Sequence, residues 1–365
     1  MIKVLHITSS LKVGGAESLL AQLVPCLQKD IENFVIYFHE GPNSEILKNS
    51  GVKTFRSWGF FYKYDLFFFI KFFRLIKKIK PDYIHTHLWF ANVIGCLAGK
   101  LFGIPVINTI HLVSTVETRA SMGKFRYLLD KLTFKAAKQI ILVGQNMKVN
   151  FQNNYAFVPA EKIFVIPNCI NSELVREQGF KEQVSKESLG IDKKTFVFGC
   201  VGRLIPRKNY ASLIKLFSQV NNSSFDCSLL IIGSGPEEEK LKILIKKLNI
   251  EDKVKIISAN SAYKFYPIMD AYITVSFEEG LSIALLEALS FGLPIILQSH
   301  NKEHELVIDG QNGLIKKTDE EIVLAMRIFL EDFMLIKSFG DYSKKFVEEK
   351  YSLNCLVENY KNIYK

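Results

Sequence analysis

The sequence predicts an α/β protein made of two doubly wound domains, each with a parallel sheet covered by helices. Three observations support this prediction. The chain has 365 residues, which is long for one hydrophobic core and suits two. Short β-branched and aromatic runs alternate with longer amphipathic ones, as in βαβ units. The alternation also starts twice, with a polar, charged stretch over residues 171–195 between the two series, which we interpret as the inter-domain connection.

Each series has its own expected strands, separated for the most part by helical patterns. The first series runs to Asn168 and the second opens at Phe196. A last helical pattern covers residues 345–365, after the second sheet is complete. The expected strands are 3–8, 33–38, 82–87, 105–110, 139–143, 162–168, 196–202, 228–235, 253–258, 271–276 and 294–298.

Composition limits the class of protein. The 48% share of hydrophobic residues is ordinary for a globular chain, and the six cysteines form no C-x-x-C pair, so we expect reduced thiols. The N-terminus lacks the apolar core of an export signal, and no uncharged apolar run reaches the about 18 residues that span a bilayer. We therefore expect a cytoplasmic protein. The net charge of +10 fits nucleic acid, an anionic membrane surface or an anionic small substrate.

A glycine pair, Gly14 and Gly15, stands between the first expected strand and the first helical pattern. At such a junction, backbone N–H groups at the helix N-terminus can approach an anion. Glycines at strand–helix turns are also common for conformational reasons alone, so the pair is a weak signal by itself. The G-x-G-x-x-G fingerprint of dinucleotide-binding proteins is absent, which disfavours a nicotinamide cofactor.

Charged groups and glycines also follow strands of the second series. Arg203 and Lys208 stand between a strand and a helix, where doubly wound sheets bind ligands, and a guanidinium with an ammonium suits a diphosphate. Two solvated loop charges are the ordinary alternative. The binding site is favoured because Gly233 follows a second strand, and because Glu279 and Glu287 follow a third.

Glu279 and Glu287 flank the start of an expected helix that stops at Gly292. Their backbones would lie roughly 12 Å apart, which exceeds the about 5–9.5 Å between the carboxylates of a glycosidase. The pair therefore suits the two ends of an elongated ligand, whose hydroxyl groups donate to the carboxylates while amides and cations hold a central diphosphate. The alternative is a solvated Glu287 and a Glu279 that only stabilises the helix N-terminus. Apolar neighbours predict a buried helix, in which an unpaired glutamate would be costly.

Together these motifs resemble the retaining nucleotide-sugar transferases of glycosyltransferase family four, which have the GT-B fold. The resemblance covers nearly the whole chain. It rests on Val201-Gly202-Arg203-Leu204 with Lys208-Asn209, Gly233 to Pro236, Glu279 and Glu287 with Gly292-Leu293-Pro294, Gly14 to Glu17, and the segment 81–92.

The resemblance implies two Rossmann-like domains facing a central cleft, with a C-terminal helix that crosses back to the N-terminal domain. Residues 1–170 with 346–365 would form the acceptor-binding domain, and residues 171–345 the domain that binds the nucleotide sugar. Two positions depart from the family pattern. Gly280-Leu281-Ser282 replaces the usual Gly-Phe-Gly, and Cys169 replaces the usual glycine after Pro167-Asn168.

The resemblance also implies roles for single residues. Arg203 and Lys208 would hold the donor diphosphate, Glu287 the ribose hydroxyls and Glu279 the transferred sugar. His111 matches the family's active-site histidine near the sugar, although a lone histidine is more often structural. His85 and His87 are expected to have packing or supporting roles. The implied catalytic residues are His111, Glu279, Arg203 and Lys208, and the implied donor site is Gly14, Gly15, Arg203, Lys208, Gly233, Gly280, Leu281, Ser282 and Glu287.

The expected chemistry depends on charge. Breaking the anomeric bond leaves a nucleoside diphosphate that gains negative charge, so preorganised cations and helix-end amides lower the barrier. The sequence has no Asp-x-Asp pair and no clustered ligand set for Mg²⁺ or Zn²⁺, so we expect neither a metal nor another cofactor. Retention of configuration is implied by the resemblance alone.

An aromatic and basic stretch over residues 58–81 concerns the acceptor. Such a helix can lie in the interface of an anionic membrane, or pack on the sheet with a solvated basic face, and both alternatives stay open. Family members often act on lipid-linked or membrane glycans, so the resemblance implies a glycan or polyprenyl-linked acceptor. It also implies transfer of a hexosyl or N-acetylhexosaminyl residue in bacterial surface polysaccharide synthesis. Such an enzyme would contact the inner face of the cytoplasmic membrane peripherally. The apolar band is Leu66, Phe69, Ile70, Phe73 and Ile76, widened by Phe60, Phe61, Phe67, Phe68 and Phe72, and the basic edge is Lys71, Arg74, Lys77 and Lys78.

Two other classes remain open. A nucleotide-sugar epimerase could share the two-domain fold and would convert the donor without an acceptor. A basic nucleic-acid-binding module is the non-enzymatic alternative, but the sequence lacks aromatic-basic recognition motifs, so we expect no nucleic acid partner.

Overall fold

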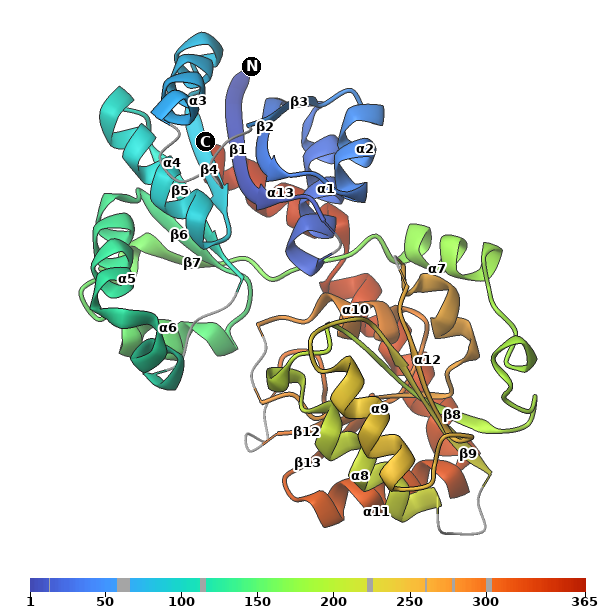
Figure 1. Cartoon of the computed structure of the whole chain (residues 1–365). Helices are drawn as coiled ribbons and strands as arrows, with labels where there is room; N and C mark the ends of the chain where they lie inside the picture. The colour runs from blue at the N-terminus through green and yellow to red at the C-terminus, as the bar shows by residue number, and fades with distance from the viewer. Residues whose placement is uncertain are drawn as a thin grey trace. The chain divides into compact units, whose positions relative to one another are not determined.

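The chain folds into two compact units, each a parallel sheet between helices (Figure 1). Unit 1 comprises Met1–Cys169 and Leu353–Lys365, and unit 2 comprises Ile170–Ser352. The computed structural model describes residues 1–12, 14–57, 66–111, 116–221, 226–259, 261–277, 280–299 and 304–365, with the backbone alone at 66–68, 116–122, 124 and 221.

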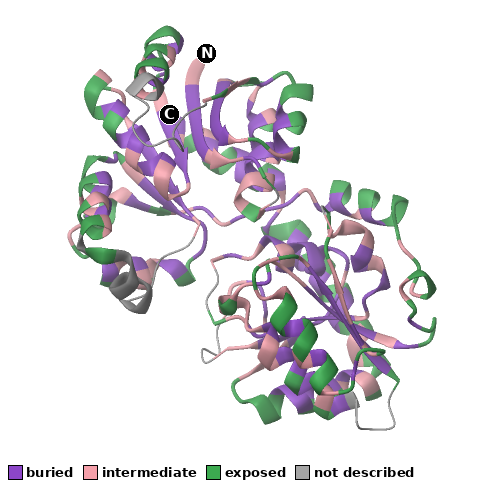
Figure 2. Ribbon diagram, viewed as in Figure 1, coloured by how far each residue is buried: buried purple, intermediate pink, exposed green. Residues whose placement is uncertain are grey.

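Unit 1 contains a seven-stranded sheet in the order β3-β2-β1-β4-β5-β6-β7, and its strand pairs are parallel. The strands are largely buried, as the purple ribbons in Figure 2 show, because helices cover both faces of the sheet. They are β1 (Ile2–Ser10), β2 (Ile31–His39), β3 (Lys53–Arg56), β4 (Tyr83–His87), β5 (Val106–Ile110), β6 (Gln139–Leu142) and β7 (Ile163–Val165).

Alternation along β2 divides the core of unit 1 between the two faces of its sheet. Phe34 and Ile36 belong to one apolar cluster, which also contains side chains of α3 (Leu66–Ile79), α4 (Trp89–Phe102), α5 (Val116–Ala136) and α6 (Asn146–Asn154). Val35 and Tyr37 point to the other face, where they pack with α1 (Gly15–Leu27) and α2 (Pro42–Asn49). The last helix, α13 (Leu353–Tyr364), contacts α1.

Helix α3 packs on the sheet through its apolar side. Phe72 and Ile76 are buried in the core cluster, and Phe69 and Phe73 lie against it. Of the two alternatives left open for this stretch, packing on the sheet therefore describes α3. Its basic edge is exposed, as expected. Phe60 and Phe61 lie outside the described residues, as do the side chains of Leu66, Phe67 and Phe68.

Unit 2 contains a six-stranded parallel sheet in the order β10-β9-β8-β11-β12-β13. Its strands are β8 (Phe196–Val201), β9 (Cys227–Ile232), β10 (Val254–Ile257), β11 (Ala271–Thr274), β12 (Ile295–Gln298) and β13 (Gly313–Lys316). Its helices are α7 (Ser172–Lys181), α8 (Tyr210–Asn221), α9 (Glu238–Lys247), α10 (Ile283–Ser290), α11 (Asp319–Glu331) and α12 (Phe333–Lys350), with short 3₁₀ turns at Pro206–Lys208 and Tyr263–Ile268.

One expectation about local structure was wrong and another is refined. The stretch 171–195, interpreted as the inter-domain connection, falls within unit 2, which begins at Ile170, and it contains α7, whose N-cap Asn171 accepts a hydrogen bond from Leu174 N. The pattern over 345–365 is not one helix, because α12 ends at Lys350 and α13 starts at Leu353. Between them Ser352 forms a bridge with Ile170, whose N–H donates to Tyr351 O at 2.9 Å, so the chain is extended there.

Two strands were missed, and both are four-residue edge strands. β3 and β13 contain lysine or arginine and are only partly buried, so their residues lack the apolar runs of central strands. No helix in the described residues combines the length and the apolar character that crossing a membrane requires.

Candidate active site

Both sheets reverse their strand order at one point, and ligands of doubly wound folds bind there, beyond the carboxyl ends of the strands. In unit 1 the reversal lies between β1 and β4, and in unit 2 between β8 and β11. Gly14 follows β1 and His87 ends β4. Arg203 and Lys208 follow β8, and Gly280 follows β11. Sequence motifs from both halves of the chain are thus next to the reversal point of their own unit.

Glycines allow the loops after β8 and β9 to touch through their backbones. A Cβ on Gly233 would lie 1.9 Å from Gly202 O, and one on Gly235 would lie 2.4 Å from Leu204 O. Leu204 N donates to Ser234 O at 2.9 Å across the same contact. Gly233 is therefore required for close packing of the two loops, which positions the segment that carries Arg203 and Lys208.

Lys208 is held against the end of β8. It ends the 3₁₀ turn, and Asn209 then takes a left-handed φ of 53°. A Cβ on Gly202 would lie 3.3 Å from Lys208 Nζ and 2.9 Å from the Tyr210 hydroxyl, so both groups cover this glycine. A small pocket lies beside them at the ends of β8 and β11, and its polar lining residues are Lys208, Tyr210, Tyr272, Thr274 and Ser276.

Arg203 lies in the same loop, but its side chain is exposed. No described residue forms an ion pair with it, and it does not line the pocket that contains Lys208. The two predicted cations therefore differ: Lys208 is positioned in a recess, whereas Arg203 presents a guanidinium to solvent beside it.

Helix α10 begins without a side-chain cap. Ser282 is its N-cap residue and makes no capping hydrogen bond, so the first N–H groups of the helix are available to an acceptor. Gly280 precedes this end and Leu281 is buried next to it. The helix stops before Gly292, as expected, where φ is 78°. Glu279 lies outside the described residues, so its predicted role stays a prediction.

Glu287 lies inside α10 and is buried, with 8% of its surface exposed. Its Oε2 accepts a hydrogen bond from the Tyr266 hydroxyl at 2.8 Å. Burial raises the pKa of Glu287 to about 7, while the hydrogen bond from Tyr266 acts in the opposite direction. Oε1 makes no hydrogen bond to a described residue. The solvated-residue alternative is therefore wrong for Glu287, and one carboxylate oxygen remains for a ligand.

In unit 1, Gly14 is the N-cap residue of α1 and Gly15 its first residue. Gly14 has an extended backbone, with φ 178° and ψ 150°, and offers no side-chain cap. The Glu17 side chain lies over Gly14, so an acidic group is next to this helix end, and the anion-binding role of the glycine pair stays a prediction.

His111 directly follows β5, and burial lowers its pKa to about 4. Its Nε2 is buried and has no hydrogen-bond partner among the described residues. The His87 ring lies 5.9 Å away, centre to centre. His85 stacks on Tyr360 of α13 with a centre distance of 5.4 Å, and its Nδ1 forms a hydrogen bond with the Tyr364 hydroxyl, which is the expected packing role.

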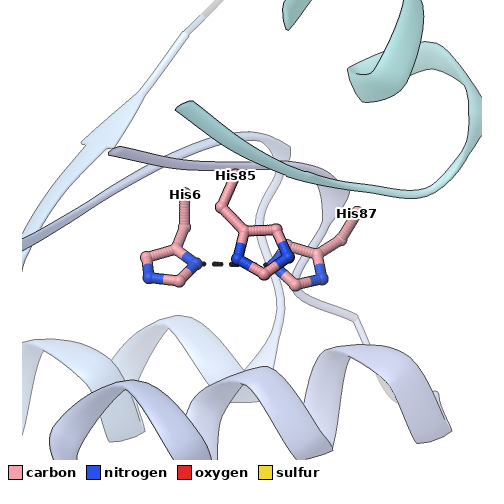
Figure 3. A group of neighbouring side chains, drawn as sticks. All are labelled: His6, His85 and His87. Atoms are coloured by element: carbon pink, nitrogen blue, oxygen red, sulfur yellow. Dashed lines mark hydrogen bonds between the residues drawn. The ribbon is translucent and has the colours of Figure 1, made fainter. Parts of the chain in front are cut away.

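Sequence analysis missed His6, which stands inside β1 and joins this group (Figure 3). Potential ligand atoms of His6, His85 and His87 lie within 4.8 Å of one another, the geometry in which a metal site would be sought. The rings are stacked, however, with interplanar angles of 28° for His6–His85 and 20° for His85–His87. Stacked rings direct their nitrogens side by side and not at one central ion.

Tyr266 and Tyr272 were also missed. The only signal for Tyr266 was a tyrosine in an apolar segment, "KFYPIM", and its link to Glu287 is set by tertiary packing. The Tyr272 hydroxyl lies 3.2 Å from both Val201 N and Val201 O, so it fixes the end of β8 next to the pocket.

Family models match both units. The model for Glycosyltransferase Family 4 matches residues 13–174, and the model for glycosyl transferases group 1 matches residues 181–346. Among characterised proteins, the chain is 26% identical to the UDP-Gal:alpha-D-GlcNAc-diphosphoundecaprenol alpha-1,3-galactosyltransferase of Escherichia coli, over 100% of this chain and 96% of the relative. It is also 26% identical to an N-acetylgalactosaminyltransferase of Campylobacter jejuni that acts on a diphospho-undecaprenol-linked sugar, over 92% of each chain.

Solved structures share the fold of the whole chain. Anabaena HepE in complex with UDP-glucose superposes with a TM-score of 0.84 at 18% identity, over 100% of this chain and 99% of that one. WaaG, a glycosyltransferase of lipopolysaccharide biosynthesis, superposes with a TM-score of 0.76 at 14% identity, over 100% of both chains. The chain therefore belongs to the family 4-like glycosyltransferases, and its two Rossmann-like units make up a GT-B fold.

Proposed function

We propose that this protein transfers a hexosyl or N-acetylhexosaminyl residue from a nucleotide diphosphate sugar to a polyprenyl-linked glycan. Transfer retains the anomeric configuration, needs no metal ion and belongs to the synthesis of a bacterial surface polysaccharide. The observation that carries the proposal is the set of groups near the β8/β11 reversal point: Lys208 in a recess, the uncapped end of α10, and the buried Glu287, whose Oε1 bonds to no described residue.

The chemistry of these groups supports a nucleotide diphosphate sugar. Lys208, Arg203 and the α10 amides suit the two phosphates, and they stabilise the negative charge of the leaving group without a metal. The Glu287 carboxylate suits a pair of ribose hydroxyls. His111 is neutral, because burial lowers its pKa to about 4, so it can donate or accept a hydrogen bond at the sugar without introducing charge.

The lipid-linked acceptor is supported by the two relatives, both of which act on undecaprenol-linked diphosphates and match over at least 92% of this chain. It is also supported by the outer surface of helices α3 to α6, which we call the basic-apolar surface. Its described exposed basic residues are Lys71, Arg74, Lys77, Lys78, Lys100 and Lys135, and its most exposed large apolar residues are Leu97, Leu101, Phe125, Leu128, Leu132 and Val149.

Acidic side chains are scarce on the basic-apolar surface. Within the described side chains of α3 to α6, Asp130 is the one carboxylate, and it is buried. It accepts hydrogen bonds from Trp89 Nε1 at 2.7 Å and from the Tyr155 hydroxyl at 3.1 Å. Positive charge and exposed apolar groups without competing acids suit the surface of an anionic membrane, where a polyprenyl-linked acceptor resides.

Incubation with a panel of nucleotide sugars tests the donor, because a ligand that binds only the native state raises its melting temperature. The stabilising sugar is then incubated with undecaprenyl diphosphate-linked N-acetylhexosamine in the presence of a chelator. We expect a lengthened lipid-linked product of retained configuration. Conversion of the sugar nucleotide to a new sugar nucleotide without acceptor would identify an epimerase instead, and stabilisation by DNA or RNA alone would identify a nucleic-acid-binding protein.

A further inference from the structure

A hydrogen-bonded chain of side chains crosses the sheet of unit 1 from Gln28 to His87. Asn33 Nδ2 donates to Ile31 O at 2.9 Å and to Gln28 Oε1 at 3.3 Å, and Asn33 N also donates to Gln28 Oε1. These two carbonyl acceptors fix the orientation of the Asn33 amide. Its Oδ1 therefore points at His6 Nε2, which lies 3.1 Å away.

The Asn33 carbonyl determines the tautomer of His6. Because Oδ1 can only accept, His6 Nε2 must carry the proton and donate. His6 is buried and burial lowers its pKa to about 4, so the ring is neutral and its Nδ1 carries a lone pair. His87 Nε2 lies 3.4 Å from that Nδ1, as the dashed line in Figure 3 marks. An accepting His6 Nδ1 requires a donating His87 Nε2–H.

The same reasoning leaves one nitrogen of His87 unpaired. Burial lowers the pKa of His87 well below its usual value, so the ring is neutral and its Nδ1 is an acceptor. This Nδ1 is buried and has no partner among the described residues. The Nε2 of the neighbouring His111 is also buried without a described partner. Buried polar atoms in folded proteins are almost always hydrogen-bonded, so two adjacent exceptions indicate a missing group.

A metal ion is a poor candidate for the missing group. His6 uses both ring nitrogens in hydrogen bonds, and so does His85, whose Nε2 lies 2.7 Å from Thr109 Oγ1 and whose Nδ1 contacts the Tyr364 hydroxyl. A metal would have to break these contacts and rotate stacked rings. A hydroxyl group fits without rearrangement, because it can donate to one nitrogen and accept from another.

We propose that His87 Nδ1 and His111 Nε2 together bind one hydroxyl group, supplied by water in the ligand-free protein and by the transferred sugar in the complex. The hydroxyl donates to His87 Nδ1 and accepts from His111 Nε2–H. The ring centres lie 5.9 Å apart, which is close enough for one oxygen atom to lie within hydrogen-bond distance of both rings. The sugar part of this proposal rests on the proposed function.

Position in the fold supports a ligand at this place. His87 is the last residue of β4 and His111 directly follows β5, so both stand at the carboxyl edge of the sheet, next to its reversal point. His87 would thus select the sugar hydroxyl, and Asn33 and His6 would act as positioning residues that keep its Nδ1 free of a proton.

The tautomers can be measured on the unmodified protein with ¹⁵N-labelled histidine, because ¹⁵N spectra separate protonated from unprotonated ring nitrogens. At neutral pH we expect His6 and His87 as neutral rings with the proton on Nε2. A proton on His87 Nδ1 would overturn the proposal. So would a common shift of His6, His85 and His87 on addition of Zn²⁺, which would identify a metal site.

Ligands then separate the two sources of the hydroxyl. A nucleotide sugar that stabilises the protein should shift the His87 Nδ1 signal, whereas the matching nucleoside diphosphate should not. A stabilising nucleotide sugar that leaves this signal unchanged would overturn the assignment to the sugar. If no nucleotide sugar stabilises the protein, the proposed function fails, while the tautomers still test the hydroxyl site.

Two substitutions of His87 provide a matched pair. His87→Gln keeps a polar group near Nε2 and loses the acceptor at Nδ1, whereas His87→Asn keeps an acceptor near Nδ1. We measure the affinity of each variant for the nucleotide sugar and for the nucleoside diphosphate. In His87→Gln the affinity for the nucleotide sugar should fall about tenfold, which corresponds to one lost hydrogen bond, while the affinity for the nucleoside diphosphate stays the same. His87→Asn should keep most of its affinity for the nucleotide sugar. His85→Gln is the control for the loss of a buried histidine. It should lower the melting temperature but leave unchanged the ratio of the affinities for the nucleotide sugar and the nucleoside diphosphate. Equal losses in both His87 variants would contradict the proposal.

Discussion

The two units share one architecture but differ in what they bury. The interior of unit 1 holds buried polar side chains in several hydrogen-bonded pairs beneath the covering helices: His6 with His87, His85 with Tyr364, and Asn108 with Thr86. The interior of unit 2 is apolar over most of its sheet, as in β9, where all six residues are buried, and Glu287 is its single buried carboxylate among the described residues. The same fold therefore accommodates a polar core in one unit, where hydrogen bonds pair buried rings and amides, although His87 Nδ1 and His111 Nε2 have no partner among the described residues.

This difference shows two ways of building a ligand site. Unit 2 relies on backbone: glycines such as Gly233 bring loops together, and the α10 end supplies N–H groups. Unit 1 relies on buried rings whose neutral state depends on desolvation, since burial is the largest cause of the lowered pKa of His87 and of His111. The glycines and amides of unit 2 do not titrate, so its response to pH comes from Glu287, whereas that of unit 1 comes from its buried histidines.

The largest expected effect is an opposite response of the two units to acid. His6 and His111 have their pKa lowered to about 4, so the unfolded chain takes up protons first, and stability is lost as the pH falls below about 6.5. At about pH 5, each of these two histidines should lower the free energy of unfolding of unit 1 by about 2 kcal/mol.

Glu287 in unit 2 has its pKa raised to about 7, so its contribution to stability is present at low pH and is lost as the pH rises through that value. Unit 2 should therefore gain about 2 kcal/mol between about pH 7 and about pH 5.

Hydrogen exchange followed by mass spectrometry measures this response peptide by peptide, after correction for the intrinsic rate. We expect faster opening of β1, β4 and β5 at about pH 5 and slower opening around α10. Glu287→Gln should abolish the gain in protection of unit 2 at acid pH and should leave the loss of protection in unit 1 unchanged. Parallel loss of protection in both units would contradict the comparison.

The next effect concerns the cations of unit 2. Lys208→Ala and Arg203→Ala should each lower turnover by about 10²-fold or more, because a preorganised charge at the leaving diphosphate is lost. Lys208 lies in a recess and Arg203 is exposed, so we expect the larger loss for Lys208. Lys240→Ala, at a side chain that is 74% exposed on α9, is the control and should keep normal turnover. Near-normal turnover in both site variants would remove the diphosphate role.

Glu287 and Tyr266 give a smaller effect with a distinctive pH profile. Glu287→Gln should weaken the nucleotide sugar by at least about tenfold, because a neutral amide replaces a carboxylate acceptor. Tyr266→Phe removes the donor that lowers the pKa of Glu287, so the loss of affinity should be greatest near neutral pH and should recover as the pH rises. Isothermal titration of the nucleotide sugar into each variant across the pH range distinguishes the effect of Glu287→Gln from that of Tyr266→Phe. A Tyr266→Phe loss that is constant with pH would show that the tyrosine acts by packing alone.

The smallest expected effect tests the surfaces of the two units. Replacing Leu128 and Leu132 by serine on α5 should weaken binding to vesicles that contain anionic lipid several-fold, since these side chains are 50% and 58% exposed and would bury only the remaining part of their apolar surface at the membrane. The matched control replaces Ile243 and Leu324 on unit 2, which are 68% and 57% exposed. Flotation at low and high salt measures both. Equal weakening by the two pairs, or no flotation of the unmodified protein at low salt, would contradict a membrane role for the basic-apolar surface.

Sequence patterns predicted the central strands well because parallel strands covered on both faces are almost continuously apolar. They predicted the edge strands β3 and β13 poorly, since partial exposure allows Lys53 and Lys316 there. They placed Arg203, Lys208 and His111 next to strand ends because strand–helix junctions are visible in one dimension. The break between α12 and α13 was not visible, because it depends on the contact of Ser352 with Ile170, which is distant in sequence.

The sequence by itself determined the two-sheet α/β architecture, the glycine turns and the chemical types available at each junction, since these follow from local propensity and periodicity. Only the tertiary structure decided which polar groups are paired and which are left free. Tyr266 meets Glu287 across 21 positions, and His6 meets His87 across 81. Such contacts have no local pattern, because they arise from how elements pack, and they fix both the ionisation of Glu287 and the free nitrogen of His87.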